Sequence, residues 1–260
     1  MTSPIEALVD FLSTAPHEAK LYDACRSYTL RCDGDANPNP ATNGEFMVLR
    51  NAIPGSQLAV DAGAERGVFI DEMLRLNPAL AIHAFEPDPR SYATLQAKGY
   101  PPSVTLENLA LGACEEERDL WLYGDVTELS TLHARPLLPG LPVERPTGSV
   151  RVRVTTLDDY CAARGLGRID FLKIDAEGHD LKILQGARRL LAAGAIRGVQ
   201  FEFGAGNIYS HDLLQDFFAF FETLPYVLHK IHPEWLARHD RYDNRLESFA
   251  YQNWLAVLRG

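Results

Sequence analysis

Residues 58–67, which read LAVDAGAERG, carry the pattern that decides the fold. The first three are apolar, as in a buried strand, the fourth is an acid, and a turn containing Gly63 leads into a helix expected to begin at about Gly67. A second apolar run, 81–85, ends in Glu86. A strand, a glycine turn, a helix and a second strand with an acid at its end form the unit with which an open parallel sheet binds an adenosine-containing cofactor.

The charges of this loop favour one class of cofactor. Asp61 and Glu65 lie near the expected N-terminus of the helix, where their charge would repel the pyrophosphate of a dinucleotide. The spacing D-x-G-x-x-x-G also differs from the dinucleotide pattern G-x-G-x-x-G. S-adenosylmethionine carries a positive charge on sulfur and an ammonium group but no phosphate. The acidic loop therefore predicts S-adenosylmethionine as the cofactor.

The rest of the chain alternates between apolar runs and helical patterns. This alternation predicts βαβ units and a parallel sheet. The last part of the chain adds a helix at 213–221 and strands at 226–231 and 248–257. Five core strands are expected at 58–62, 81–86, 103–109, 169–175 and 196–203, with helices between them at 67–76, 89–98, 157–164 and 179–193.

The segment 115–155, between the third and fourth core strands, is interpreted as a hairpin or lid insertion. Residues 118–123 and 149–154 alternate as the two strands of a β-hairpin, and the long connection between them is rich in Pro and Gly. Long loops inside compact domains often act as lids or binding loops, which makes Ser130 and Thr131 candidates for binding the acceptor substrate. An ordinary surface loop would explain the same pattern.

The segment before the sheet has a different character. Between residues 3 and 31, apolar positions recur at helical spacing and predict two helices broken near Pro16. Residues 33–43 are rich in turn-forming residues and predict a mobile loop. We therefore expect an N-terminal helical extension and loop over 1–50 and a catalytic domain over 51–260.

The composition excludes several classes of protein. The chain has 35 acidic and 25 basic residues and a net charge of −10, which disfavours nucleic acid as a partner because phosphates need a basic surface. No apolar run reaches the ~18 residues expected of a membrane span, and the N-terminus lacks the pattern of a signal peptide. The four cysteines show no C-x-x-C spacing, so we expect a cytoplasmic protein without a disulfide framework or zinc site.

A third segment extends the pattern to a family. Residues 169–180, IDFLKIDAEGHD, read as an apolar strand followed by an acidic loop. Together with residues 60–64 and 85–87, this segment resembles the FkbM-type family of S-adenosylmethionine-dependent methyltransferases. The resemblance covers about residues 55–258, and its further pieces stand in the expected order: NLALG at 108–112, TLDD at 156–159, LQGA at 184–187, and Glu202.

The resemblance implies a fold and a preferred reaction. The fold is α/β, the Rossmann-like fold of class I methyltransferases, with a mostly parallel seven-stranded sheet whose last strand is antiparallel and with helices on both faces. The reaction implied is O-methylation. One departure is Glu65, which stands where the family usually has Asn.

Cofactor-binding residues follow from the geometry of the sheet. Ligands of open α/β sheets bind at the carboxyl ends of the strands, where the strand order reverses. Glu86 should accept hydrogen bonds from the ribose hydroxyls, unless it caps the helix after Pro87. Asp61 should orient the methionine ammonium, and Asn108 and Ala110 should flank the adenine. The full predicted set is Asp61, Gly63, Glu65, Gly67, Glu86, Pro87, Asn108, Ala110 and Asp175.

The catalytic candidates are three ionisable residues at one strand end, Asp175, Glu177 and His179. Such groups are costly to desolvate unless they are used or paired. His179 is the first choice of general base, since its unperturbed pKa is the only one near neutrality. A solvent-facing place in the first turn of the next helix is the alternative. Lys173, inside the same apolar strand, could pair with a carboxylate.

Glu202 ends the fifth core strand and faces the same crevice. With Asp175 and Asn207 it could hold a divalent cation through hard oxygen ligands. Glu202 and Asn207 are also candidates for binding the acceptor. The sequence leaves the metal requirement open.

These features together predict S-adenosylmethionine-dependent O-methylation of a hydroxyl on a small molecule, such as a sugar, a glycolipid or a secondary metabolite. One alternative is a methyltransferase that acts on a glycan or a protein. Another is a non-catalytic cofactor-binding scaffold, which the departure at Glu65 would allow. The sequence leaves the oligomeric state open, with a homodimer as one option.

Overall fold

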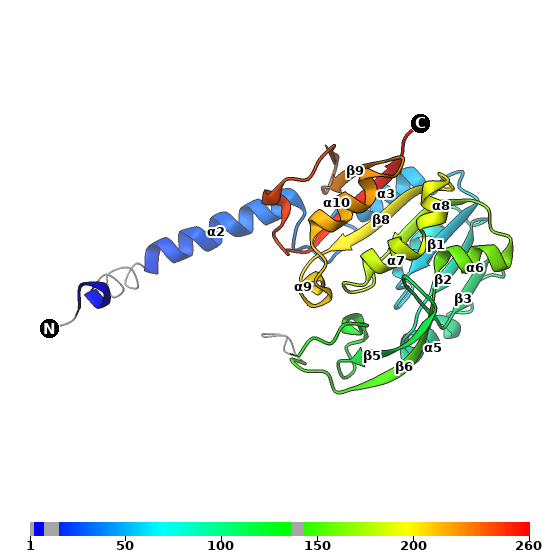
Figure 1. Ribbon diagram of the computed structural model, residues 1–260, viewed down its shortest axis with the longest axis horizontal. Coiled ribbons are helices and arrows are strands. Elements are labelled where there is room, and N and C mark those ends of the chain that lie inside the picture. The colour runs from blue at the N-terminus through cyan, green and yellow to red at the C-terminus, as the bar shows by residue number, and fades with distance from the viewer. Residues whose placement is uncertain (1–2, 8–15, 137–142) are drawn as a thin grey trace.

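The computed structural model describes residues 3–7, 16–136 and 143–260, and its centre is a mixed sheet of eight strands (Figure 1). The strand order is β10-β9-β11-β8-β7-β1-β2-β3. These strands are β1 (Leu58–Ala62), β2 (Ala81–Phe85), β3 (Val104–Glu107), β7 (Ile169–Ile174), β8 (Ile196–Phe203), β9 (Tyr226–Ile231), β10 (Leu236–His239) and β11 (Gln252–Leu258).

The pairing of the strands confirms the predicted α/β class. Strands β3, β2, β1, β7 and β8 pair in parallel, and β11 runs antiparallel to both β8 and β9, as expected of the last strand. All seven expected strands are present, and β10 adds an eighth at the edge, antiparallel to β9. Its four residues, LARH, are too few and too mixed to show a strand period.

Helices connect and cover the strands. The expected helix 179–193 is divided into two helices, with an interruption after Gly186. The Cα of Gly186 packs against the carbonyl oxygen of Gly112. None of the helices in the described ranges is both long and apolar enough to cross a membrane. The main helices are α3 (Glu45–Ala52), α4 (Val68–Leu76), α5 (Pro89–Ala97), α6 (Leu157–Arg164), α7 (Asp180–Gly186), α8 (Arg188–Ala192), α9 (Gly206–Ser210) and α10 (Leu214–Glu222). Of these, α3 and α9 were not predicted.

The sheet is buried on both faces, as expected for a doubly wound fold. All five residues of β1 are buried. Val60 packs in a core with α6, α7, α8 and α10, whereas its neighbour Ala59 packs in a second core with α3, α4 and α5. Because side chains alternate along a strand, these two cores lie on opposite faces of the sheet.

The insertion forms a small sheet of its own, as predicted. Strand β5 (Glu116–Leu122) and strand β6 (Gly148–Thr155) pair in antiparallel register. A short strand not seen in the sequence, β4 (Ala110–Leu111), adds to β6 in parallel. The connection contains the 3-10 helix η1 (Thr127–Leu129); its residues 137–142 lie outside the described ranges.

The N-terminal part contains a helix that extends away from the body, α2 (Pro16–Asp33) (Figure 1). It begins at Pro16, where the sequence predicted a break. Of the expected preceding helix, only residues 4–7 are described as helical. The predicted mobile loop at 33–43 instead packs on the body, where Asp35 is buried and pairs with Lys230 at 2.9 Å.

Candidate active site

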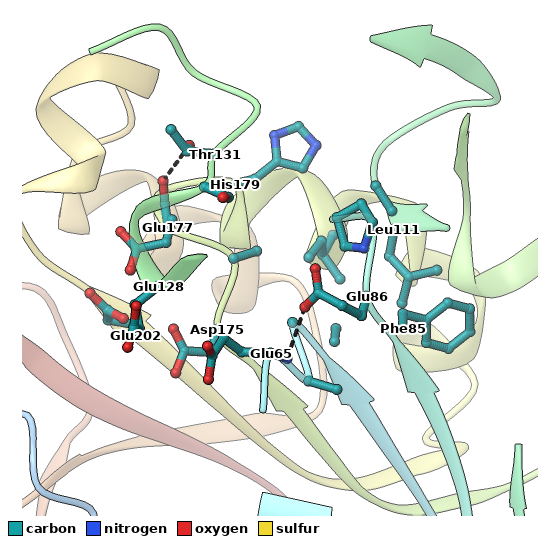
Figure 2. Close-up of a pocket in the computed structure, with 18 of the residues that line it drawn as sticks. Glu65, Phe85, Glu86, Leu111, Glu128, Thr131, Asp175, Glu177, His179 and Glu202 are labelled. Carbon is teal, nitrogen blue, oxygen red and sulfur yellow. Dashed lines mark hydrogen bonds between the residues drawn. The ribbon is translucent and has the colours of Figure 1, made fainter. Parts of the chain in front are cut away.

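A cavity of about 320 Å³ opens at the carboxyl ends of the parallel strands. Strand β1 lies between β7 and β2, so the strand order reverses here, and open α/β sheets bind their ligands at such points. Figure 2 shows Glu86 on one side of the cavity and the carboxyl groups of Asp175, Glu177 and Glu202 gathered on the other. We call these the cofactor side and the acceptor side.

The cofactor side begins with a tight turn after β1. Gly63 has a φ of +91°, and a Cβ atom there would lie 1.8 Å from the carbonyl oxygen of Asp175. Gly67, with a φ of +77°, stands directly before α4, and a Cβ atom there would lie 2.2 Å from the Tyr100 hydroxyl. Only glycine fits both positions without strain. Gly63 was predicted to bind the cofactor. In the structure, the backbone of Asp175 comes close to Gly63.

Glu65 contacts the cofactor side through its backbone. Its N–H donates to Glu86 Oε2 at 2.8 Å, a contact that any residue could make. Its carboxylate accepts a hydrogen bond from the Thr127 hydroxyl at 2.8 Å and so faces the insertion. The backbone φ of Glu65 is +46°, in the left-handed region where Asn is tolerated better than Glu.

Glu86 is buried and held by two backbone donors. Besides the Glu65 N–H, the N–H of Asp88 donates to Glu86 Oε1 at 2.7 Å. Burial raises the pKa of Glu86 to about 7. The cap of α5 is Asp88, whose carboxylate accepts from the Arg90 N–H. The alternative in which Glu86 caps this helix is therefore wrong, and its carboxylate keeps free lone pairs for a ligand.

Asp61 lies beneath the cavity rather than in its wall. Its carboxylate is buried, and within the described parts of the chain neither oxygen has a hydrogen-bond partner. Burial raises the pKa of Asp61 to about 7, although Lys173 opposes the rise. A buried carboxylate without donors is costly unless a ligand or water satisfies it. Its contact with a methionine ammonium, direct or through water, remains a prediction.

Of the remaining cofactor candidates, some line the cavity and others do not. Pro87 and Ala110 line the cavity. Asn108 does not; its side-chain amide donates to the backbone carbonyls of Glu86 and Pro87, at 2.8 and 3.1 Å. Asn108 therefore fixes the loop that carries Glu86. The apolar wall expected around an adenine is formed by other side chains, Leu109 and Leu111 among them.

On the acceptor side, Asp175 and Glu202 form a pair. The fully buried Lys173 donates to Asp175 at 2.9 Å, as its place in an apolar strand suggested. Burial alone would raise the pKa of Asp175, but Lys173 and a hydrogen bond from Glu202 hold it below its usual range. Burial, with Asp175 and Glu177 nearby, raises the pKa of Glu202 well above its usual range. Glu202 is therefore the weaker acid of the two.

Glu177 is held by an arginine from the insertion. Arg135 is buried, and its Nη2 lies 2.6 Å from Glu177 Oε2 and 2.7 Å from the Glu177 carbonyl oxygen. Burial raises the pKa of Glu177, and Arg135 limits the rise. The backbone φ of Glu177 is +53°, a left-handed conformation that needs support from its surroundings.

His179 is buried, so the solvent-facing alternative is wrong. Its Nδ1 lies 3.0 Å from Nε2 of His133, which comes from the insertion. Burial, with His133 nearby, lowers the pKa of His179 to about 3. The expectation of an imidazole that titrates near neutrality is therefore also wrong, and His179 is neutral and weakly basic. Its ring lies apart from the carboxyl groups of the acceptor side (Figure 2).

The two insertion candidates, Ser130 and Thr131, both line the cavity. The Ser130 hydroxyl donates to Asp88 at 2.9 Å, and the Thr131 hydroxyl donates to the Glu177 carbonyl oxygen at 3.0 Å. The insertion is therefore bonded to loops on both sides of the cavity.

The predicted cation site does not form. Asn207 does not line the cavity, and its side-chain oxygen accepts from the Gly204 N–H at 2.9 Å. Across residues 3–7, 16–136 and 143–260, no cluster of three or more His, Cys, Asp or Glu side chains is arranged to hold a metal. Asp175 and Glu202 bond each other instead.

Sequence reasoning missed several residues of the site. Arg135 lies in the irregular part of the insertion, where no periodicity marks a buried side chain. Pro38, Pro40 and Tyr251 also line the cavity, and they come from segments distant in sequence from every motif. Only the position of the insertion beside the predicted site offered a signal.

A family model and two named proteins match this chain in sequence. The family model described as "Methyltransferase FkbM domain" matches residues 61–245. Methyltransferase 1 of Beauveria bassiana is 29% identical over 182 residues, which cover 60% of this chain and 73% of that protein. The 31-O-demethyl-FK506 methyltransferase FkbM of Streptomyces tacrolimicus is 29% identical over 167 residues, 53% of this chain and 63% of that protein.

Two solved structures of methyltransferases match this chain with TM-scores below 0.5. The crystal structure of methyltransferase FkbM from Methylobacillus flagellatus matches with a TM-score of 0.46 and 19% identity over 78% of this chain. The match spans 43% of that chain. A putative O-methyltransferase from Klebsiella pneumoniae matches with a TM-score of 0.47 and 12% identity, over 86% of this chain and 83% of the other.

Proposed function

This chain belongs to the methyltransferase FkbM family, and from that premise we propose that it uses S-adenosylmethionine to methylate a hydroxyl group of an uncharged small molecule. The observation that carries the proposal is the cavity at the reversal of strand order, with a carboxylate for the ribose on one side and a carboxyl cluster on the other.

The cofactor side fits S-adenosylmethionine. The two donors already on Glu86 fix its carboxylate, and its free lone pairs can accept the two ribose hydroxyls. Apolar side chains line the cavity beside it. The orphaned carboxylate of Asp61 lies below, where it favours the positive charge of the ammonium. When bound, S-adenosylmethionine would supply an electrophilic methyl group.

Glu65 does not argue for a non-catalytic scaffold. The contact that this residue makes with Glu86 comes from its backbone N–H. A Glu at position 65, where the family usually has Asn, therefore keeps that contact. The Glu65 carboxylate is turned toward Thr127.

The charge of the cavity favours an uncharged acceptor. Six carboxyl groups line it, and none of its lining residues in the described ranges is Lys or Arg. A phosphate or carboxylate on the acceptor would be desolvated beside like charges, which is unfavourable. A hydroxyl, by contrast, can donate to a carboxylate. The name of the Streptomyces relative, a 31-O-demethyl-FK506 methyltransferase, supports O-methylation as the reaction class.

Within this proposal Glu177 is the general base. Its raised pKa makes it a better proton acceptor near neutrality than Asp175, whose carboxylate is stabilised by Lys173. His179 is too weakly basic to compete. The proton of the acceptor hydroxyl would pass to the Glu177 carboxylate, while Asp175 and Glu202 help to orient the acceptor.

Calorimetry followed by an acceptor screen tests the proposal. We expect S-adenosylmethionine and S-adenosylhomocysteine to bind and NAD not to bind. A screen by mass spectrometry would then pair neutral acceptors with anionic counterparts, such as methyl glucoside with glucose 6-phosphate. Methylation of neutral members alone is expected. Binding of NAD alone would contradict the cofactor, and methylation of anionic members would contradict the acceptor class.

A further inference from the structure

The loop that carries Glu177 depends on the insertion for its shape. Glu177 has a left-handed backbone, and at the next position, Gly178, a Cβ atom would lie 2.7 Å from the backbone of Gly206. The Glu177 carbonyl oxygen accepts hydrogen bonds from Thr131 and Arg135. Both donors are buried and belong to the insertion.

Arg135 is committed to Glu177. A single nitrogen, Nη2, makes two contacts with Glu177, one to its carboxylate and one to its carbonyl oxygen. The backbone on either side is fixed by Tyr123, whose hydroxyl donates to the Arg135 carbonyl oxygen at 3.0 Å and accepts from its N–H at 3.2 Å. The guanidinium is therefore placed by the fold and is not drawn from solvent.

The other charged groups around Glu177 are acidic. Asp175, which follows β7, and Glu128, in η1, both disfavour a negative charge on Glu177. The pKa of Glu202, on β8, is itself raised by Glu177. Tyr123 is neutral, since burial raises its pKa further. Arg135 is the cation paired with the Glu177 carboxylate within the described residues, so the ionised form of Glu177 depends on it.

We propose that Arg135 is a positioning residue of the methyl-transfer site, which keeps the Glu177 carboxylate ionised and turned toward the acceptor side. This inference rests on the proposed function, because it gives Arg135 its role through the general base. It also gives the insertion a role in the chemistry, through one partly buried ion pair between residues 42 positions apart.

The test measures the ionisation of Glu177 directly. Protein labelled with 13C at the glutamate carboxyl carbon is titrated by NMR with S-adenosylhomocysteine bound, and the Glu177 signal is assigned from Glu177→Gln. In Arg135→Gln, which keeps a donor but no charge, the titration midpoint should rise by about 1–3 pH units, the usual effect of losing an adjacent opposite charge. Arg135→Met serves the same purpose if Arg135→Gln does not fold.

Two controls separate charge from structure. Arg135→Lys keeps a cation and one donor nitrogen, so its midpoint should stay near that of the wild type. Thr131→Val removes the neutral contact to the same carbonyl oxygen and should leave the midpoint unchanged. An unchanged midpoint in both charge-removing variants, or an equal rise in Thr131→Val, would overturn the proposal.

The proposed function can fail independently. If wild-type protein does not bind S-adenosylhomocysteine in the calorimeter, the function is wrong whatever Glu177 does. If it binds and the midpoint behaves as expected, the acid limb of the pH–rate profile with a neutral acceptor should move upward in Arg135→Gln by the same amount, and activity should return at higher pH.

Discussion

The two sides of the cavity are held together in different ways. On the cofactor side, the bond from the Glu65 N–H to Glu86 joins residues 21 positions apart, and the bond from the Asp88 N–H joins neighbours two apart. On the acceptor side, Arg135 and Thr131 reach Glu177 from 42 and 46 positions away, and His133 reaches His179 from 46. Glu86 is therefore held by backbone N–H groups, whereas Glu177 and His179 are contacted by side chains of the insertion.

We therefore expect mutations on the two sides to have different effects. Damage to the acceptor side should lower turnover while the cofactor still binds, because in the proposed function its side chains contact the acceptor and the reacting proton. Damage to the cofactor side should weaken cofactor binding or the fold itself.

The largest expected effect comes from Glu177→Gln. Loss of a general base lowers the rate by about 10²–10⁴-fold, whereas the affinity for S-adenosylhomocysteine should change little because Glu177 lies on the acceptor side. Turnover with a neutral acceptor and calorimetry would measure the two quantities. Glu128→Gln is the matched control, since Glu128 lines the same cavity but its side chain is nearly half exposed. Equal losses in both variants would deny Glu177 a special role.

The next effect concerns the contact between the two sides. Gly63→Ala should destabilise the protein by about 2–5 kcal/mol, the sum of a left-handed alanine and an overpacked contact, because its Cβ would lie 1.8 Å from the Asp175 carbonyl oxygen. Thermal or denaturant unfolding measures this. Gly55→Ala is the control, since Gly55 has a φ of +83° but nothing within 4 Å of a Cβ. A similar cost at both positions would mean that backbone conformation alone, and not the contact, requires Gly63.

The cofactor side itself is tested by Glu86. Glu86→Ala should weaken S-adenosylmethionine binding by about 1.5–3 kcal/mol, the range for hydrogen bonds to a charged group, while the rate with saturating cofactor changes less. A folded variant with an unchanged dissociation constant would remove Glu86 from the cofactor site.

The pH dependence of cofactor affinity is a second test of the cofactor side. Burial raises the pKa of both Asp61 and Glu86 to about 7, so both carboxyls are increasingly protonated below that value. The charged forms favour a cationic cofactor, and affinity should therefore rise as pH increases through about 7. Calorimetry between pH 6 and 8 checks this. Glu86→Gln, which cannot ionise, should reduce the dependence, and affinity that falls with pH would contradict it.

The same division explains what the sequence could predict. The strand at 58–62 was predicted to the residue, because an apolar run marks a buried strand. The strand at 196–203 was also predicted to the residue, and its second half, VQFEF, alternates between apolar and polar residues. The N-cap of α6 likewise involves neighbours in the chain, since Thr156 accepts from the Asp159 N–H at 3.0 Å. These features depend on residues close together in the chain.

Features that depend on distant contacts were missed or misjudged. His179 was wrongly expected to titrate near neutrality. Its pKa is lowered by burial and by His133, and a local sequence pattern reveals neither of these. Arg135 gave no signal, since its partner is 42 positions away. Asn207 was placed with the carboxylates, but it bonds within its own loop. A motif locates a residue along the chain, whereas its ionisation depends on what packs around it.

The smallest expected effect tests whether Glu65 belongs to the cofactor side or the acceptor side. Glu65→Asn would lose the hydrogen bond to Thr127, worth about 0.5–1.5 kcal/mol, but it would ease the left-handed backbone at φ +46°. The N–H contact to Glu86 is kept, so we expect the affinity for S-adenosylhomocysteine to change by less than about 1 kcal/mol. Thr127→Val removes the same bond from the insertion, and the double variant should be no worse than the sum of its parts. A loss as large as that of Glu86→Ala would mean that the side chain of Glu65, and not its backbone, serves the cofactor. Glu65 would then belong to the cofactor side through its side chain as well as its backbone.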